Sequence, residues 1–421
     1  MKLLPEFIIR TPLYPFGKKV KDSSFLEALY LSSPILYNES QKINSNKDIE
    51  DKELRKINIS INKYQSRASS RCTPFGLFAG LSTWQFSTQS KVCINSDLLQ
   101  SLRRQTRLDM NTLCQLAQEL SEKKFIQPHL LFYPNNSSYK INESLRYVEY
   151  YYDNYIRFHK ISKVDYSIYL ELLLKEAKSG KTITQLAHIL VDDEISIEEA
   201  NGFIHTLINE QILVSNLAPT VTGKEFFLVI MDILTSIYSK HPEDELLMII
   251  HKLKEINSAI KKLDNEIFNE IGAYKEIHKI VSDLLPSISD INLFQTDLFK
   301  KTYTSNLHFD IQKSILEAIT FLNRISPFDG QNNLENFKRR FKKRYNDEEI
   351  PLLKALDTET GIGYLNSEAS DVNELIDDIH HFSVSSEYDL NWTELESVLH
   401  KLLTKSIAAN KKEIEVSEED F

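Results

Sequence analysis

Hydrophobic side chains recur at helical and strand spacing along most of this chain. Between residues 52 and 70, Leu54, Ile57 and Ile61 are spaced by three or four, which places them on one face of a helix. Residues 242–284 continue the same spacing over a longer stretch. That stretch predicts a paired helical hairpin inside one domain, and an intermolecular coiled coil remains the alternative. Polar residues crowd positions 38–52 and predict an exposed loop.

Residues 139–222 have a pattern of their own. Short segments rich in Tyr, Val and Ile, separated by polar breaks, predict a meander of three strands. Three helices follow, and capping-box spacing at Thr182 and at Ser196 predicts where the second and third begin. A returning strand at 212–215 closes the unit. This order of elements suggests a winged-helix module.

The elements together predict a helix-rich, multidomain α+β fold with mixed and antiparallel sheets. Glycine occurs only 10 times and proline 12 times in 421 residues, which disfavours a turn-rich sandwich made of strands alone. We expect an α+β part at 1–138, the winged-helix module at 139–222, and a helical-hairpin and α+β continuation at 223–421. The C-terminal sequence lacks the turn or capping residues that close a last element, so we expect the chain to be truncated there.

Composition and charge exclude several classes of function. The longest apolar run, 226–231, is far shorter than the ~20 residues of a membrane-spanning helix, and the N-terminus lacks the apolar core of a secretory signal. The expected location is therefore the cytoplasm. A formal net charge of −10 opposes non-specific binding to polyanions, so a nucleic-acid partner would need a local basic site. The three cysteines fit no zinc or redox spacing, and we expect no metal site.

The most unusual stretch is SRASSRCTPFGLFAG at 66–80. Arg67 and Arg71 are four residues apart at a helix end, where they share a face and can form a forked clamp for phosphates or carboxylates. A surface helix that continues into a buried turn is the alternative. The Thr-Pro step forces an extended turn, and the two glycines allow close backbone approach. No GxGxxG, P-loop, GxSxG, HExxH or CxxC motif occurs, so common nucleotide, hydrolase and metalloprotease chemistries have no anchor.

The string RxxxRxTPFGLFAG at 67–80 resembles the signature of class I lanthipeptide dehydratases, the nisin dehydratase family. The resemblance extends over essentially the whole chain. It implies the family's chemistry, in which glutamate from glutamyl-tRNA is esterified to Ser and Thr hydroxyls of a precursor peptide and then eliminated. It also implies glutamyl-tRNA as co-substrate, with no metal or nucleotide cofactor. Further stretches match in order: Phe7–Pro12, Arg107–Asp109, Phe294–Leu298, Phe341–Tyr345, Ile350–Leu353 and Leu356–Tyr364.

The resemblance assigns catalytic roles by position. Arginines there could balance the charge that builds on the departing 3′ oxygen of the tRNA. The aspartates could orient the α-ammonium of the glutamyl group or hold the arginines, and for each a purely structural salt bridge is the alternative. The residues that match family positions linked to glutamylation are Arg10, Arg67, Arg71, Thr73, Asp109 and Asp297.

Two basic clusters could track tRNA phosphates despite the acidic total. For the second cluster, a solvated helix face above buried Phe337 and Phe341 is the alternative. The candidates are Arg103, Arg104 and Arg107 in the first cluster and Arg339, Arg340 and Lys343 in the second.

The winged-helix pattern fits the family's leader-recognition element. An exposed strand edge beside a helix can accept an extended peptide by β-augmentation, and a packed module with no open edge is the alternative. The peptide-binding candidates are Tyr155, Arg157 and His159 on the strand and Phe203 and Leu207 on the helix.

Length is the main departure from the family. Members with both activities are considerably longer and carry a C-terminal elimination domain, so we interpret this chain as a fragment or a split protein. Its expected partners are a precursor peptide with a leader, tRNA, and an elimination domain or protein; a cyclase and a second copy of the chain are further candidates. Two other hypotheses remain: an aminoacyl-tRNA-dependent peptide ligase and a non-catalytic module that binds the leader.

Overall fold

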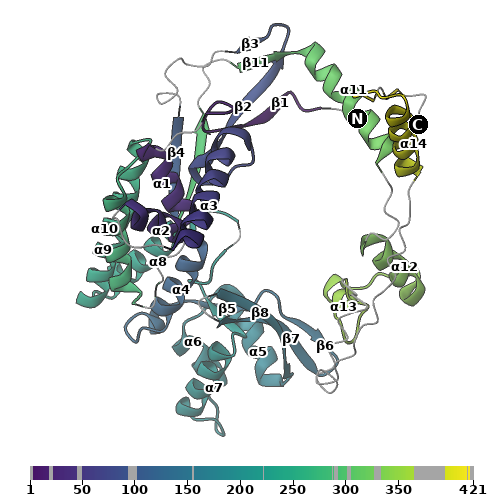
Figure 1. Ribbon diagram of the computed structural model, residues 1–421. Helices are drawn as coiled ribbons and strands as arrows, with labels where there is room; N and C mark the ends of the chain where they lie inside the picture. The colour runs from purple at the N-terminus through teal and green to yellow at the C-terminus, as the bar shows by residue number, and fades with distance from the viewer. Residues whose placement is uncertain are drawn as a thin grey trace. The chain divides into compact units, whose positions relative to one another are not determined.

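The computed structural model of this protein divides into two compact units (Figure 1). The larger comprises residues 4–308, and the smaller comprises residues 309–421 together with 1–3. Each unit is described by itself below. The residues that the structure describes are 3–18, 22–44, 50–92, 102–153, 156–220, 222–286, 288, 293–300, 305–326, 333–364, 394–414 and 416–417.

A mixed six-stranded sheet runs through the larger unit. Strand β2 pairs antiparallel with β1 and parallel with β10 and β11, while β4 is antiparallel to β10 and β3 is antiparallel to β11. This arrangement confirms the α+β fold with mixed pairing. The strands are β1 (Glu6–Pro12), β2 (Ala79–Ser87), β3 (Lys91–Val92), β4 (Leu102–Leu108), β10 (Phe294–Lys300) and β11 (Ser305–His308).

Helices α1 (Ser23–Ser32), α2 (Pro34–Asn44) and α3 (Asp51–Ser70) form a core with this sheet. The helix expected at 52–70 is confirmed as α3, and it buries Ile57 and Ile61 as the spacing requires. The loop expected at 38–52 is wrong for residues 38–44, which are helical. Tyr37 and Ile43 pack against the core, so tertiary contacts there override a polar local sequence. Residues 45–49 lie outside the described residues.

The elements of the predicted winged-helix module are all present and in the predicted order. Both capping boxes form, at Thr182 with Gln185 and at Ser196 with Glu199. The returning strand β9 pairs with β5, not with the meander β6–β7–β8. The elements of the predicted module are β6 (Tyr139–Ile141), β7 (Ser144–Asp153), β8 (Ile156–Asp165), α5 (Ile168–Glu176), α6 (Ile183–Leu190), α7 (Ile197–Asn209) and β9 (Leu213–Ser215). Strand β5 (Phe132–Pro134), the partner of β9, lies before the expected limit at 139.

The long apolar repeat forms an intramolecular hairpin, as predicted. Helix α9 (Asp244–Asn265) packs against both α8 (Phe226–Lys240) and α10 (Ile271–Leu284) within the larger unit. One hydrophobic core runs from Leu108 to Phe294 and includes α4 (Met110–Ser121) and the winged helix. This hydrophobic core continues across residues 138 and 222, where we expected one domain to end and the next to begin. The division into three domains stays a prediction.

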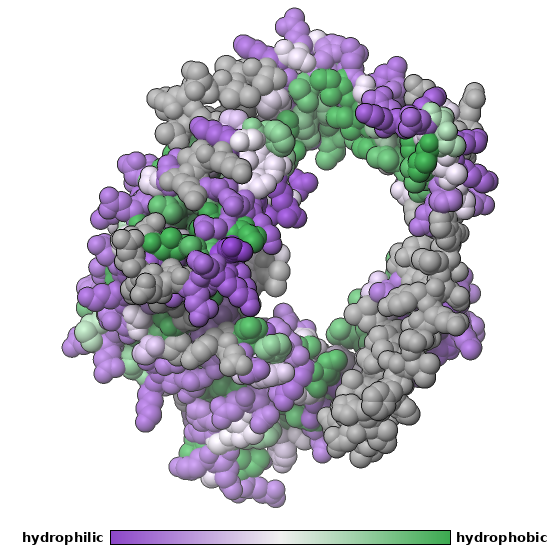
Figure 2. All heavy atoms as spheres, viewed as in Figure 1, coloured by the Kyte–Doolittle hydropathy of each residue, from purple (hydrophilic) through white to green (hydrophobic). Residues whose placement is uncertain are grey.

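The smaller unit contains α11 (Phe309–Ile325), α12 (Asn333–Tyr345), α13 (Leu352–Leu356) and α14 (Glu394–Ala408). Large apolar side chains of α11, among them Ile311 and Leu322, are exposed. In Figure 2, green atoms gather over the position of α11. None of the described helices is long and apolar enough to cross a membrane. In the same part of the chain, no group of three or more His, Cys, Asp or Glu side chains could hold a metal ion.

Gly80 marks a close contact between β2 and β10. A Cβ atom there would lie 3.1 Å from the carbonyl oxygen of Leu298 and 3.2 Å from the Cγ of Leu298, so a side chain at this position requires the neighbouring strand to shift by a few tenths of an ångström. Gly202 in α7 is the contrasting position, because a Cβ there would meet nothing within 4 Å.

We expect Gly80→Val to lower the free energy of unfolding by about 1–3 kcal/mol, because overpacking displaces backbone. Gly202→Ala should raise it by about 0.5–1 kcal/mol, because glycine is a poor residue inside a helix. Urea denaturation followed by circular dichroism measures both. An unfolding midpoint for Gly80→Val equal to that of the wild type would contradict the close contact.

Candidate functional site

The signature stretch forms the end of α3 and a sharp turn into β2. Arg71 caps the helix, and its amide donates to the carbonyl of Arg67. Gly76 adopts a positive φ of +54°, which glycine tolerates without strain, and starts the short 3-10 turn at 76–78. The guanidinium of Arg67 stacks over the Phe75 ring with its carbon 4.3 Å from the ring centroid. Burial and the nearby charge of Arg71 lower the pKa of Arg67.

A cavity of about 1010 Å³ opens beside this turn. Segments that are distant in sequence form its walls: the end of α1, the signature turn, the start of α4, the start of β8 and the strand β10, together with Ile288. Asp109 and Asp297 both line it, as the resemblance led us to expect of two residues in one site. The lining side chains that bear on its chemistry are Ser32, Phe75, Asp109, Cys114, Arg157 and Asp297.

The two aspartates are held differently. Asp109 is the N-cap of α4, where its carboxylate accepts a 2.9 Å hydrogen bond from the amide of Asn111. Asp297 accepts a 2.6 Å hydrogen bond from Arg107, in an ion pair whose side chains are 39% and 33% exposed. Arg107, which the sequence suggested for tRNA phosphates, is therefore engaged with a candidate catalytic carboxylate. Asp297 therefore does form a salt bridge, and its catalytic role stays a prediction.

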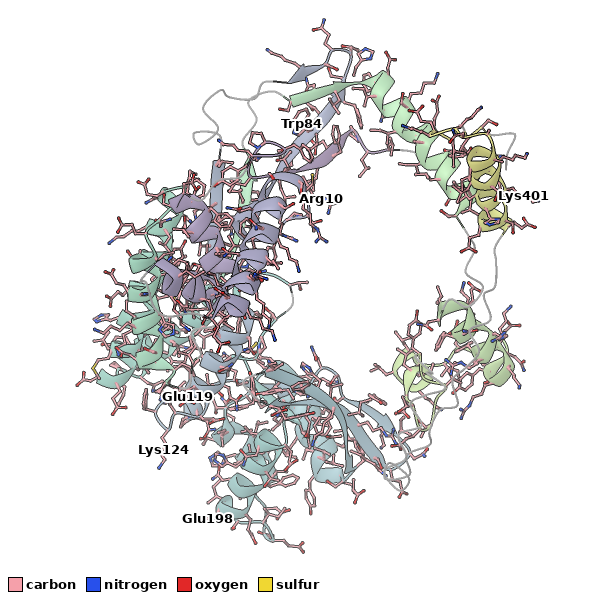
Figure 3. The ribbon with its side chains drawn as sticks, in the orientation of Figure 1. Arg10, Trp84, Glu119, Lys124, Glu198 and Lys401 are labelled. Atoms are coloured by element: carbon pink, nitrogen blue, oxygen red, sulfur yellow. The ribbon has the colours of Figure 1, made fainter. Side chains whose placement is uncertain are left out.

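The other catalytic candidates do not line the cavity. Arg71 and Thr73 are exposed at the beginning of the signature turn. Arg10 is exposed on β1 (Figure 3), opposite Leu81 of β2. The structure therefore brings Asp109 and Asp297 into one cavity with residues 74–76. It places Arg10 outside that cavity, on β1, which pairs with β2.

Sequence reasoning missed Lys300 at the end of β10. Its ammonium donates a 2.8 Å hydrogen bond to the carbonyl of Pro12, which ties β10 to the end of β1. Burial lowers the pKa of Lys300, and a thiolate at Cys72 would raise it. No motif distinguishes this lysine, because its role depends on strands that are far apart in sequence.

Arg104 is the clearest correction to the predicted tRNA-binding residues. It is 1% exposed and cannot contact a phosphate, whereas its neighbour Arg103 is exposed. Strand β4 alternates between a buried and an exposed face, so two adjacent arginines that look equivalent in sequence point in opposite directions.

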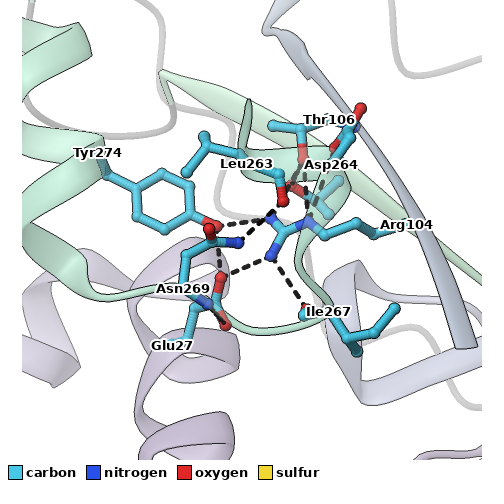
Figure 4. Close-up of polar contacts among 9 residues, drawn as sticks. Glu27, Arg104, Thr106, Leu263, Asp264, Ile267, Asn269 and Tyr274 are labelled. Carbon is cyan, nitrogen blue, oxygen red and sulfur yellow. Dashed lines mark hydrogen bonds and ion pairs between the residues drawn. The ribbon is translucent and has the colours of Figure 1, made fainter. Parts of the chain in front are cut away.

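The buried guanidinium of Arg104 is surrounded by hydrogen-bond acceptors (Figure 4). It donates 2.6 Å to Glu27 of α1 and 2.5 Å to the hydroxyl of Tyr274 of α10. It also reaches the side chain of Thr106 and the carbonyl of Ile267. Burial raises the pKa of the Tyr274 hydroxyl.

The second basic cluster lies on α12 in the smaller unit. Arg340 donates to the carbonyls of Ile362 and Gly363, at 2.8 and 3.2 Å, so its guanidinium fixes a turn. Arg339 and Lys343 are exposed. Of the three candidates in this cluster, Arg339 and Lys343 therefore present their charge to solvent, and Arg340 does not.

The structure places the peptide-binding candidates in different surroundings. Strand β8 pairs only with β7 among the described strands, and His159 is exposed on it. Phe203 lines a groove of about 340 Å³ with Tyr169 and Ile195. Leu207 is a correction: it is 4% exposed, because α7 turns this position into the core.

Arg157 lies on the wall of the large cavity rather than in the groove. Tyr155 lies outside the described residues.

Comparison with known proteins bears on the fold and the family. A sequence profile described as "Lantibiotic dehydratase, N terminus" matches residues 21–421. Nisin biosynthesis protein NisB of Lactococcus lactis subsp. lactis is 27% identical over 348 residues, 82% of this chain and 33% of that protein. Subtilin biosynthesis protein SpaB of Bacillus subtilis is 25% identical over 367 residues, 85% of this chain and 34% of that protein. The chain spans about a third of the length of these curated relatives.

Two solved structures share the fold. The tRNA dependent lantibiotic dehydratase MibB from Microbispora sp. 107891 superposes with a TM-score of 0.76 at 20% identity, over 99% of this chain and 39% of that one. The glutamylation domain TbtB from thiomuracin biosynthesis, bound to 5′-phosphodesmethylglutamycin, gives a TM-score of 0.54 at 14% identity, over 92% of this chain and 47% of that one. The roles of individual residues stay predictions.

We expect Arg104→Gln to lower the free energy of unfolding by about 3–5 kcal/mol, because Glu27 is left as an unpaired buried charge. Arg103→Gln, one residue away and exposed, should change it by less than about 0.5 kcal/mol. Chemical denaturation of both variants tests this contrast. Equal stability of the two variants would show that Arg104 is not the buried partner described here.

Proposed function

The chain belongs to the lantibiotic dehydratase family, as its N-terminal part, and from this premise we propose that it transfers glutamate from glutamyl-tRNA to Ser and Thr hydroxyls of a precursor peptide. The observation that carries the proposal is the cavity in which Asp109, Asp297 and the signature turn meet. A role in lantibiotic dehydration follows from the family. The specific glutamyl transfer is the step that we propose.

The transfer is an ester exchange. A Ser or Thr hydroxyl oxygen bonds to the carbonyl carbon of the glutamyl ester, the bond from that carbon to the ribose 3′ oxygen breaks, and the hydroxyl proton ends on the 3′ oxygen. The reaction needs neither an oxidant nor a nucleotide. Its demand on the protein is to position two substrates and to balance the charge on the carbonyl and 3′ oxygens.

The residues beside the cavity can meet that demand. Arg67 and Arg71 supply positive charge at the signature turn, and Arg10 supplies a third on β1. Asp109 and Asp297 supply carboxylates to the cavity, where they can attract the α-ammonium of the glutamyl group. Positive charge beside the cavity and carboxylates on its wall, both held in place in advance, stabilise the developing oxyanion and the ammonium of the bound donor.

The precursor peptide is proposed to bind the winged-helix module. Strand β8 has an edge without a partner among the described strands, which can accept an extended leader by β-augmentation. The groove that contains Phe203 lies on the same module and offers an apolar pocket for a side chain. Tyr169, Leu190, Ile195 and Ala200 also belong to its apolar lining.

The proposal assigns only one half of dehydration to this chain. Elimination of glutamate would come from a further domain or a partner protein, and the use of aminoacyl-tRNA would place the activity in the cytoplasm. The exposed Arg103, Arg339 and Lys343 remain the candidates for contact with tRNA phosphates.

The central test incubates the protein with its precursor peptide, glutamate, ATP, tRNA and glutamyl-tRNA synthetase, and measures peptide mass. We expect a glutamyl adduct whose rate of formation falls about 100-fold in Arg67→Ala and in Arg71→Ala, in line with the loss of one oxyanion-stabilising group. Arg55→Ala is the matched control, because Arg55 is exposed on the same helix α3 at its other end. Thermal melts verify that all variants are folded.

Other outcomes identify the competing hypotheses. Tight peptide binding without any change of mass, with or without tRNA, favours a non-catalytic leader-binding module. An adduct that persists on the peptide when an elimination partner is added favours an aminoacyl-tRNA-dependent ligase.

For the leader, we expect Phe203→Ala to weaken peptide binding about 10-fold, because truncating a half-buried aromatic anchor removes its pocket contact. His205→Ala should bind as the wild type does, since His205 is exposed on the same helix and does not line the groove. Fluorescence anisotropy of a labelled peptide measures both. Equal affinities for the two variants would remove the groove from the binding site.

A further inference from the structure

Among the described residues that line the large cavity, Arg157 is the only arginine. It comes from the start of β8, whereas Asp109 and Asp297 come from the N-terminus of α4 and from β10. No described carboxylate forms an ion pair with Arg157, in contrast to the pairs of Arg104 and Arg107. A guanidinium on a cavity wall without an acidic partner favours an anionic ligand.

The guanidinium is held in place by its surroundings. It lies over the ring of Tyr150, with its carbon 3.7 Å from the ring centroid. The backbone of Tyr150 is fixed in turn by Gln211, whose side-chain amide accepts from its N–H at 2.9 Å and donates to its carbonyl at 2.8 Å. Stacking covers a face of the guanidinium, and its edge interacts with the thiol of Cys114, which lines the same cavity. A guanidinium has five N–H donors in its plane, so further donors suit a carboxylate.

The chemistry of the walls matches a zwitterionic ligand. Carboxylates of Asp109 and Asp297 offer acceptors for an ammonium group, and Arg157 offers donors for an anion. The glutamyl group of the proposed donor carries both: its α-ammonium, and a side-chain carboxylate that stays free because the α-carboxyl is esterified.

We propose that Arg157 binds the side-chain carboxylate of the glutamyl group and thereby selects glutamyl-tRNA over glutaminyl-tRNA. This inference rests on the proposed function and names the residue that determines its donor specificity. The glutaminyl group has the same shape but a neutral amide, so it forms no charge-assisted fork with a guanidinium. A site built to hydrogen-bond one group discriminates against an isostere because its polar groups are left poorly paired.

The test measures equilibrium binding to the full chain by calorimetry, with three probes. Two are stable amide analogues of adenosine 5′-phosphate that carry a glutamyl or a glutaminyl group at the 3′ position, and the third is adenosine 5′-phosphate alone. We expect the wild type to bind the glutamyl probe at least about 10-fold more tightly than the glutaminyl probe, the ratio typical of one charge-assisted hydrogen bond.

Three variants test whether the preference for the glutamyl probe depends on the contact between Arg157 and its side-chain carboxylate. Arg157→Gln should bring that ratio close to one by weakening the glutamyl probe alone, and Arg157→Lys should retain part of it, because a lysine keeps the charge without the fork. Lys163→Gln is the matched control: Lys163 is exposed on the same strand and does not line the cavity. Retention of part of the preference in Arg157→Lys separates a loss of recognition from a loss of folding.

Several results would overturn the inference. A wild type that binds both aminoacyl probes equally, or binds neither, has no carboxylate recognition of this kind. Equal weakening of all three probes in Arg157→Gln would mean that Arg157 contacts the phosphate, and an equal loss in Lys163→Gln would mean that the effect is not local.

The proposed function is judged by a different result, the glutamyl adduct formed by the wild type. An enzyme that forms the adduct and discriminates independently of Arg157 keeps the proposed function and loses this inference. An enzyme that forms no adduct loses the function itself.

Discussion

The buried charge of Arg104 is the constraint on which the larger unit depends. A guanidinium removed from water must be surrounded by acceptors, and no single segment supplies them. Glu27 of α1, Tyr274 of α10 and the backbone before α10 converge on it, so α1, β4 and the α9–α10 hairpin assemble around one cation. The ends of α1 and β4 then become walls of the cavity, at Ser32 and Asp109. The network therefore fixes the frame in which any chemistry takes place.

The cavity connects two modules that the sequence presents as separate. Its carboxylates lie on β10, an inner strand of the central sheet, and at the N-cap of α4, while its guanidinium comes from the first residues of β8. The remainder of β8 pairs with β7 alone among the described strands, and its other edge is the proposed peptide surface. One strand thus belongs to both the proposed donor cavity and the proposed peptide surface, and this gives the two substrates of a transfer reaction a shared structural element.

Sequence patterns predicted the elements that depend on local interactions. The capping boxes at Thr182 and Ser196 form as expected because their partners lie three residues away, and α3 and the α9–α10 hairpin follow from one apolar face. Residues 38–44 were predicted to be a loop and are helical, because contacts of Tyr37 and Ile43 with a distant core outweigh a polar local sequence. The candidate site was predicted in part: Asp109 and Asp297 do share a cavity, while Arg10 lies outside it.

The sequence by itself determined the fold class, the signature turn with its glycines, and the family. It could not distinguish Arg103 from Arg104, because the partners that bury the second lie 77 and 170 residues away. It proposed Arg157 for the peptide, and it could not reveal that the start of β8 reaches a cavity, because no local pattern marks such a strand end. Elements that depend on spacing within a few residues can be predicted from the sequence. The burial of a charge and the walls of a cavity depend on contacts between distant segments, so only the tertiary structure decided them.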